Sequence, residues 1–156
     1  MGTRHLQTVI DKSGRVRIRQ YGQWDGYPEG QGVEILQYLR SGDLQKYQSE
    51  LLKIEQINKK QISEVEMDTN WRQNYPYLDR DCGSNIHQMI EDGKVKFVFF
   101  LQVGEEDWCE GFYTINFKDR TFTSKYHEVE TIFSLDNLPT DAEYLEKMGV
   151  EGNQTI

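Results

Sequence analysis

The sequence predicts an α+β fold in which a mainly antiparallel sheet, made of an N-terminal hairpin and a C-terminal meander, packs against several helices. Three observations support this class. Residues 15–19 alternate strictly between arginine and aliphatic side chains, as in a half-buried strand. Residues 33–54 repeat apolar side chains at spacings of three and four, as in amphipathic helices. Residues 94–126 contain three strand-like segments separated by short turns.

The N-terminal quarter predicts a hairpin followed by a loop. Residues 6–10 form the first strand, residues 11–14 the turn and residues 15–19 the second strand. Residues 21–32 contain four glycines and Pro28, which end the strand pattern and predict an irregular loop.

The middle of the chain predicts several helices, some with clear end signals and one segment without a regular pattern. A short helix begins at Val33, and Asp43 is a candidate cap for a second one. Residues 64–77 show no clear period and predict an ordered loop or an irregular helix. Ser84 is a candidate cap for a further helix, which Gly93 ends.

The C-terminal half predicts the meander. Residues 94–103 are almost continuously apolar, which is typical of a central strand covered on both faces. Residues 108–117 and 121–126 supply the next two strands. Thr140 and Glu143 have the spacing of a capping box, which predicts a last helix over residues 142–148.

Length and composition limit the class of protein. The 156 residues correspond to one domain, 1–156, with residues 150–156 expected to fray, and the formal net charge is −8. The sequence shows no apolar run long enough for a membrane helix and no secretory leader, so we expect a cytoplasmic protein that does not bind membranes. Cys82 and Cys109 form no CxxC pair, and we expect no disulfide, metal or cofactor.

The charge is distributed unevenly along the chain. Residues 1–20 carry a balance of +4 and residues 101–156 one of −8, which argues against broad nucleic-acid binding. An acidic surface in the last third would suit a basic partner surface, although such charges are also common on soluble domains. The candidate partner-binding residues are Glu105, Glu106, Asp107, Glu110, Asp119, Glu128 and Glu130.

A second hypothesis places a small ligand at the Gly-rich loop. A strand, a Gly-rich loop and a helix start can hold an anion such as a nucleotide, and aromatic side chains can stack on its base. The alternatives are a tight turn that closes one end of the core and a solvated row of arginines. The candidate ligand-binding residues are Arg4, Arg17, Arg19, Trp24, Asp25, Tyr27, Gly30 and Gly32.

A third hypothesis, a small hydrolase, has the least support. His5, His87 and His127 lack metal-binding spacing. Cys82 with His87 could act as nucleophile and base, but no third residue marks such a site. We therefore assign no catalytic residue.

Four segments carry a resemblance to a known group of proteins. Residues 1–5, the block 20–28 with Gly30 and Gly32, and the later segments 108–115 and 133–139 resemble a family of small uncharacterised proteins of bacteriophages, prophages and bacteria. The resemblance implies an accessory protein that binds a macromolecule, such as a host or defence protein. An inhibitor of a bacterial defence nuclease, in the manner of anti-CRISPR proteins, would fit that context.

Overall fold

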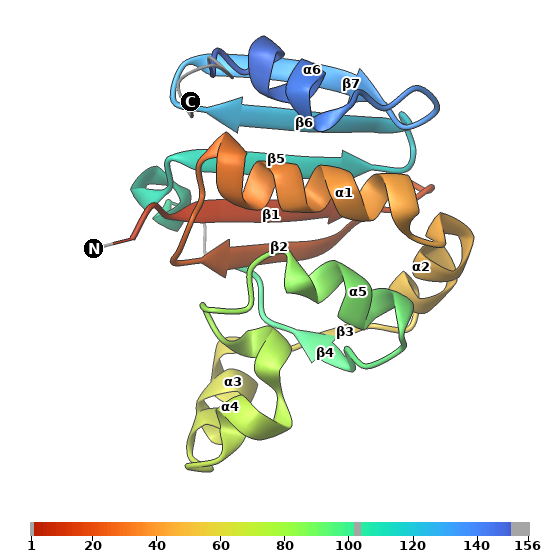
Figure 1. Cartoon of the computed structure of the whole chain (residues 1–156). Helices are drawn as coiled ribbons and strands as arrows, with labels where there is room; N and C mark the ends of the chain where they lie inside the picture. The colour runs from red at the N-terminus through yellow and green to blue at the C-terminus, as the bar shows by residue number, and fades with distance from the viewer. Residues whose placement is uncertain (1, 102–103, 151–156) are drawn as a thin grey trace.

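Five strands form one sheet in the order β2-β1-β5-β6-β7 (Figure 1). The computed structural model describes residues 2–101 and 104–150, and it confirms the α+β class with a mainly antiparallel sheet. The β1–β5 pair is parallel, and the other three pairs of this sheet are antiparallel. The strands are β1 (His5–Ile10), β2 (Val16–Gly22), β5 (Gly111–Asn116), β6 (Thr121–Tyr126) and β7 (Val129–Ser134).

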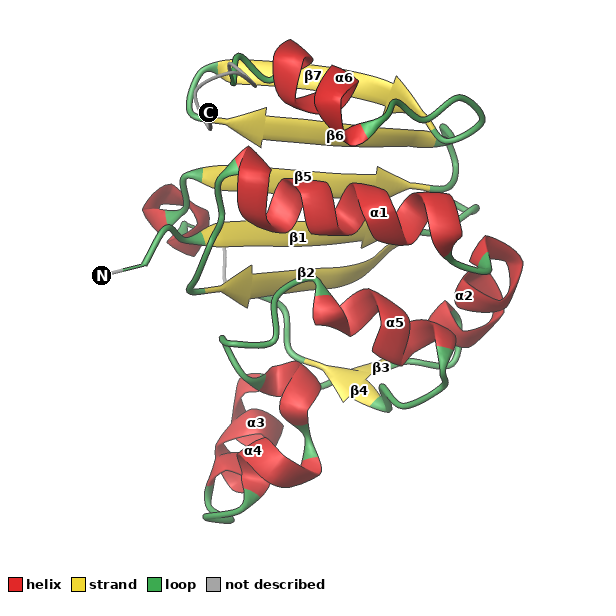
Figure 2. Ribbon diagram, in the orientation of Figure 1, coloured by secondary structure: helices red, strands yellow, loops and turns green. Residues whose placement is uncertain are grey.

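Helices cover one face of this sheet (Figure 2). α1 (Val33–Ser41) and α6 (Asp141–Lys147) lie over the face of the sheet, while α2 (Leu44–Leu51) and α5 (Asn85–Glu91) pack together beside β2. None of the described helices is long and apolar enough to cross a membrane.

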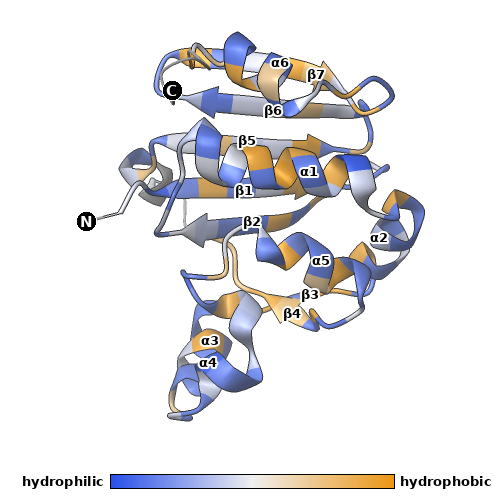
Figure 3. Ribbon diagram, viewed as in Figure 1, coloured by the Kyte–Doolittle hydropathy of each residue, from blue (hydrophilic) through white to orange (hydrophobic). Residues whose placement is uncertain are grey.

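A second, two-stranded sheet and two short helices extend the molecule beyond β2. β3 (Glu55–Gln56) pairs in parallel with β4 (Phe97–Val98). α3 (Lys59–Glu66) and α4 (Trp71–Asn74) project from this small sheet (Figure 1). Figure 3 shows that β4 is strongly hydrophobic and that the projecting part is mostly hydrophilic.

The helix-covered face of the large sheet changes character along the strands. One row across the sheet is apolar and buried: Ile18, Val9, Ile115, Phe122 and Phe133. The next row, two residues along each strand, is polar, and all its members but the half-buried Thr131 are buried: Gln20, Gln7, Tyr113, Ser124 and Thr131. The core therefore becomes polar toward the end of the sheet that carries the Gly-rich loop.

Several sequence predictions are confirmed. Asp43 caps α2 by accepting a hydrogen bond from the backbone N–H of Lys46, at 3.1 Å. Thr140 and Glu143 form the predicted capping box of α6. Gly93 follows α5 with a φ of +72°, which favours glycine.

The predicted central strand over residues 94–103 is wrong. Only Phe97–Val98 is a strand, and it belongs to the small sheet. The Phe97 ring lies 5.0 Å from that of Tyr75, so this apolar stretch packs on local aromatic residues. The meander instead ends in β7, whose single buried residue, Phe133, gives a weak strand signal. Residues 102 and 103 lie outside the described residues.

Three smaller predictions concern residues 64–77, the cap of α5 and the C-terminal end, and the structure contradicts the second of them. Residues 64–77 contain the end of α3 and all of α4, and α3 begins at a capping box of Asn58 and Gln61 that we did not anticipate. Ser84 precedes α5 but does not cap it, because its hydroxyl donates a hydrogen bond to Glu34 at 2.7 Å. The predicted frayed end lies outside the described residues except for Val150, whose N–H donates to the carbonyl of Leu145 at 2.9 Å.

Candidate functional site

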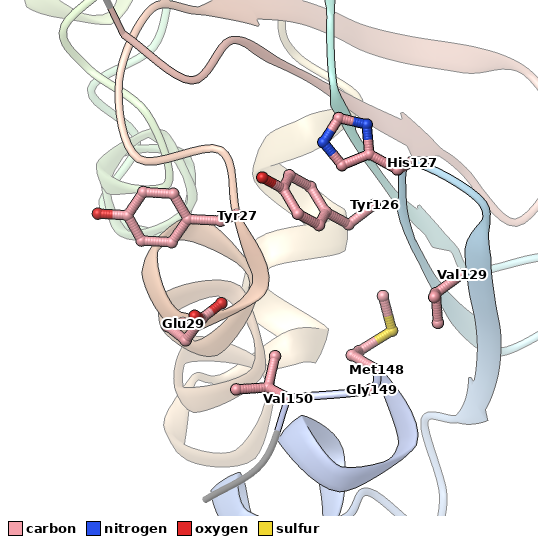
Figure 4. A pocket seen from close by; sticks show the side chains of 8 residues that line it. All are labelled: Tyr27, Glu29, Tyr126, His127, Val129, Met148, Gly149 and Val150. Atoms are coloured by element: carbon pink, nitrogen blue, oxygen red, sulfur yellow. The ribbon is translucent and has the colours of Figure 1, made fainter. Parts of the chain in front are cut away.

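A pocket of about 510 Å³ opens at the polar end of the sheet (Figure 4). Three parts of the chain meet there: the Gly-rich loop, the β6–β7 turn and the end of α6. Figure 4 shows Tyr27 and Glu29 on one side of the pocket and the rings of Tyr126 and His127 on the other. The remaining lining residues are Val129, Met148, Gly149 and Val150.

The β6–β7 turn holds two of these rings in place. Tyr126 is the last residue of β6, and His127 adopts a left-handed conformation with a φ of +53°. Their ring centroids are 4.3 Å apart with an edge-to-face orientation. The backbone N–H of His127 donates to the carbonyl of Glu110 at 3.1 Å, which fixes the turn to the start of β5.

The Gly-rich loop supplies the opposite wall. Asp25 also has a left-handed φ, +57°, and its carbonyl accepts a hydrogen bond from the backbone of Gln31 at 2.8 Å. Tyr27 donates its hydroxyl to the Asp25 carboxylate at 3.0 Å. Glu29 follows in a π-helical turn, Pro28–Gly32, that leads directly into α1. The loop therefore contributes Tyr27 and the Glu29 carboxylate to the lining of the pocket, across from the β6–β7 turn.

The surroundings of the pocket are electronegative. The hydrogen bond to Asp25 raises the pKa of the Tyr27 hydroxyl, with burial and the charges of Asp25 and Glu29 adding to it. Burial raises the pKa of Tyr126, and the charges of Glu110 and Glu29 act in the same direction. None of the described residues that line the pocket is lysine or arginine. This charge distribution favours a cationic occupant and disfavours the anion expected from the sequence.

A buried histidine, His5, lies at the same end of the sheet as the pocket. His5 is 1% exposed, and its ring nitrogens have no hydrogen-bond partner among the described residues. It pairs in register with Gly22 and Gly111, and a Cβ on Gly22 would overlap the His5 ring. Burial lowers the pKa of His5 to about 4, with the charge of Asp25 opposing that change. His5 is therefore a neutral ring at neutral pH.

A second histidine joins the polar row to α2. His87 is 1% exposed; its Nδ1 lies 2.9 Å from the Tyr47 hydroxyl and its Nε2 lies 2.5 Å from Oε1 of Gln7. Burial and, to a smaller extent, the nearby His5 lower its pKa to about 3. Because both ring nitrogens already have partners, His87 is not placed as a base for Cys82. Burial also raises the pKa of the Cys82 thiol to about 12, which leaves it a poor nucleophile.

The predicted ligand-binding residues do not converge on one site. Arg19 donates to the carbonyl of Leu101, Trp24 donates to Asp81, and Arg4 precedes β1. Gly30 packs on the backbone of Asp25, and Gly32 packs on Tyr144 and Tyr113, so both serve the loop structure. Among these candidates, Tyr27 lines the pocket and Asp25 orients it.

Arg17 has a structural partner at the far end of β2. Its Nε lies 2.8 Å from the carboxylate of Asp11, which is 3% exposed and also accepts hydrogen bonds from Ser13 and Arg15. Burial opposes the ionisation of Asp11, but these hydrogen bonds outweigh it and hold the pKa of Asp11 well below its usual range. Arg17 therefore neutralises a buried charge at the β1–β2 turn.

Replacing Arg17 tests this assignment. Arg17→Ala leaves the Asp11 carboxylate without its cation, and we expect a loss of about 1–3 kcal/mol in the free energy of unfolding. Urea denaturation measures the change, with Arg15→Ala, an exposed neighbour, as the matched control. An unchanged midpoint for Arg17→Ala would show that the ion pair contributes nothing to stability.

The predicted acidic partner-binding residues divide between the two ends of the sheet. Asp107, Glu110 and Glu128 lie at the end that carries the pocket, before β5 and in the β6–β7 turn. Asp119 follows β5, about 20 Å away by strand length, and its carboxylate accepts a hydrogen bond from Asn116. Glu130 points outward from β7. The side chains of Glu105 and Glu106 lie outside what the structure describes.

The residues that the sequence analysis missed are Glu29, Tyr126 and His127. Tyr126 ends a predicted strand, but nothing in the sequence joins it or His127 to residues 27–29. The described part of the chain contains no group of three or more potential metal ligands.

These features define an α+β protein with an acidic, aromatic pocket at one end of a half-covered sheet. Comparison with protein-family models, curated proteins and solved structures gives no significant match. The pocket and its surroundings are therefore the features from which a function can be inferred.

Proposed function

We propose that this protein acts by binding a partner protein, with the pocket at the end of the sheet receiving a lysine or arginine side chain of that partner. The observation that carries this proposal is the combination of three rings with the Glu29 carboxylate in a pocket of about 510 Å³. Aromatic faces attract a cation through their quadrupole, and a carboxylate pairs with it directly.

The acidic residues around the pocket support a macromolecular partner. Glu128 is exposed in the β6–β7 turn that lines the pocket, and the half-buried Glu110 accepts the backbone hydrogen bond of His127 in that turn. An acidic end of this kind suits a basic surface, and complementary charge accelerates association. Grooves that hold nucleic acid are basic because they neutralise phosphates. We therefore favour a nucleic-acid enzyme as the partner, and a bacterial defence nuclease is the specific candidate that the sequence resemblance suggests.

A peptide series tests whether the pocket selects a cation. We expect a short peptide with a central lysine or arginine to bind the intact protein, as measured by isothermal titration calorimetry. A peptide with norleucine, which keeps the apolar stem but lacks the charge, should bind at least about tenfold more weakly. Equal affinities for the lysine and norleucine peptides would contradict the proposal.

Variants of the lining residues test where the cation binds. Glu29→Gln removes a charged acceptor, and we expect the lysine peptide to bind about tenfold more weakly or worse. Tyr126→Ala should weaken binding similarly, whereas Tyr126→Phe keeps the ring face and should retain most of the affinity. Asp119→Asn is the matched control, because it removes an exposed charge at the opposite end of the sheet. A loss for Asp119→Asn equal to that for Glu29→Gln would indicate unspecific attraction to a negative protein.

A further inference from the structure

A second hollow lies between α3 and the small β3–β4 sheet. It is an open groove of about 500 Å³ and is remote in sequence from the loop and turn that form the first pocket. Its apolar surface comes from Ile57, Val65, Tyr75 and Phe97. Three carboxylates and an amide complete the lining: Glu55, Glu64, Asp68 and Gln61.

The aromatic side of the groove is well supported. The rings of Tyr75 and Phe97 are 5.0 Å apart, and Tyr77 packs edge-on against both of them. The buried Tyr77 accepts a hydrogen bond from the backbone of Lys96 at 3.4 Å, next to β4. This wall is therefore anchored to the main body of the protein.

The opposite wall, α3, packs much less closely. None of its residues is buried, and Ile62 and Val65 are half-buried. Its start is fixed by its own capping box, in which Asn58 and Gln61 exchange two hydrogen bonds of 2.8 Å. Met67, just after the helix, is 82% exposed. An amphipathic helix normally buries its apolar stripe, so the stripe of α3 remains available to another molecule.

The charge of the groove specifies what it would accept. None of the residues that line it is lysine or arginine, and Glu55 and Glu64 are exposed carboxylates on its two sides. Asp68 is already engaged, because it accepts hydrogen bonds from the backbone of Asn70 and the side chain of Asn74. Glu55 and Glu64 are thus the acidic groups best placed to pair with an incoming cation.

We propose that this groove is a second docking site, for a short segment of a partner protein in which apolar side chains alternate with lysine or arginine. The apolar side chains pack between α3 and the aromatic wall, and the basic ones pair with Glu55 and Glu64. The site goes beyond the pocket at the end of the sheet and does not depend on it. Two separate contacts on one partner would raise the overall affinity without strengthening either contact.

A labelled amphipathic peptide of leucine and lysine is the probe. We expect fluorescence anisotropy to show binding to the intact protein, and binding of the corresponding leucine and glutamate peptide to be at least about tenfold weaker. The double variant Glu55→Lys with Glu64→Lys should weaken binding of the lysine peptide at least about tenfold. Val65→Asp should weaken it as well, because it places a charge on the apolar wall.

Three controls make the result decisive. Glu66→Lys changes an exposed α3 residue that does not line the groove, and it should leave the affinity within about twofold. Glu29→Gln, in the first pocket, should also leave it unchanged, which separates this proposal from the proposed function. Circular dichroism of the surface variant Glu55→Lys with Glu64→Lys confirms that it is folded.

Several outcomes would overturn the proposal. An equal loss for Glu66→Lys would mean that the peptide senses only net charge. No binding by the wild-type protein would show that the groove does not accept such a segment. A wild-type dimer in light scattering that Val65→Asp converts to a monomer would show that a second copy of this chain occupies the groove.

Discussion

The free energy of unfolding is expected to fall by about 4 kcal/mol between pH 8 and pH 5 because of His5 and His87. Burial lowers the pKa of His5 to about 4 and that of His87 to about 3 in the folded protein, from an ordinary value of 6.5. Below pH 6.5 both histidines therefore become protonated in the unfolded chain but stay neutral in the folded protein. Stability is fully present above that pH and is lost progressively as the pH falls toward 4 and then 3.

Urea denaturation at a series of pH values measures this effect. Replacing both buried histidines, by His5→Gln with His87→Gln, should remove most of the pH dependence while lowering stability at pH 8. His127→Gln provides the matched control, since this residue is exposed in the β6–β7 turn, and its curve should follow the wild type. A wild-type protein equally stable at pH 8 and pH 5 would show that neither histidine is held in its neutral form.

The second large effect is expected at the centre of the apolar row. Phe122 is 0% exposed, and its ring stacks with those of Phe133 and Tyr144, each centroid 6.2 Å away. Phe122→Ala removes these contacts and leaves a cavity between the sheet and α6, so we expect a loss of about 3–5 kcal/mol. Thr123→Ala, one residue along β6 on the outward face, should cost less than about 1 kcal/mol. A Phe122→Ala loss as small as that of the control would contradict the packing described for α6.

Local signals in the sequence predicted much of this fold. The hairpin of β1 and β2, the caps of α2 and α6 and the strand β6 are each determined by residues close together in the chain. The parallel pairing of β1 with β5 joins residues about one hundred positions apart, and no local sequence pattern predicts it. The apolar residues 94–101 were misassigned because a buried strand and a segment packed on aromatic rings have the same composition.

The candidate site was less predictable for the same reason. Tyr27 and Asp25 are candidate ligand-binding residues in the sequence because glycine and aromatic residues cluster around them. Their partners Tyr126 and His127 belong to an ordinary hairpin turn, and only the tertiary structure places that turn opposite the loop. Alternation along β2 predicts that the arginines face outward. It does not show that Arg17 and Arg19 already donate hydrogen bonds to Asp11 and Leu101, which is why both were candidates for ligand binding.

The parallel β1–β5 pair also determines when the sheet can form during synthesis. β1 is an interior strand, with β2 on one side and β5 on the other. At translation rates of roughly 5–20 residues per second, β5 leaves the ribosome about 5–20 s after β1. Throughout that interval the edge of β1 that β5 later covers is open, and other chains can pair with it. That edge of β1 is closed only once β5, its neighbour in the finished sheet, has been synthesised.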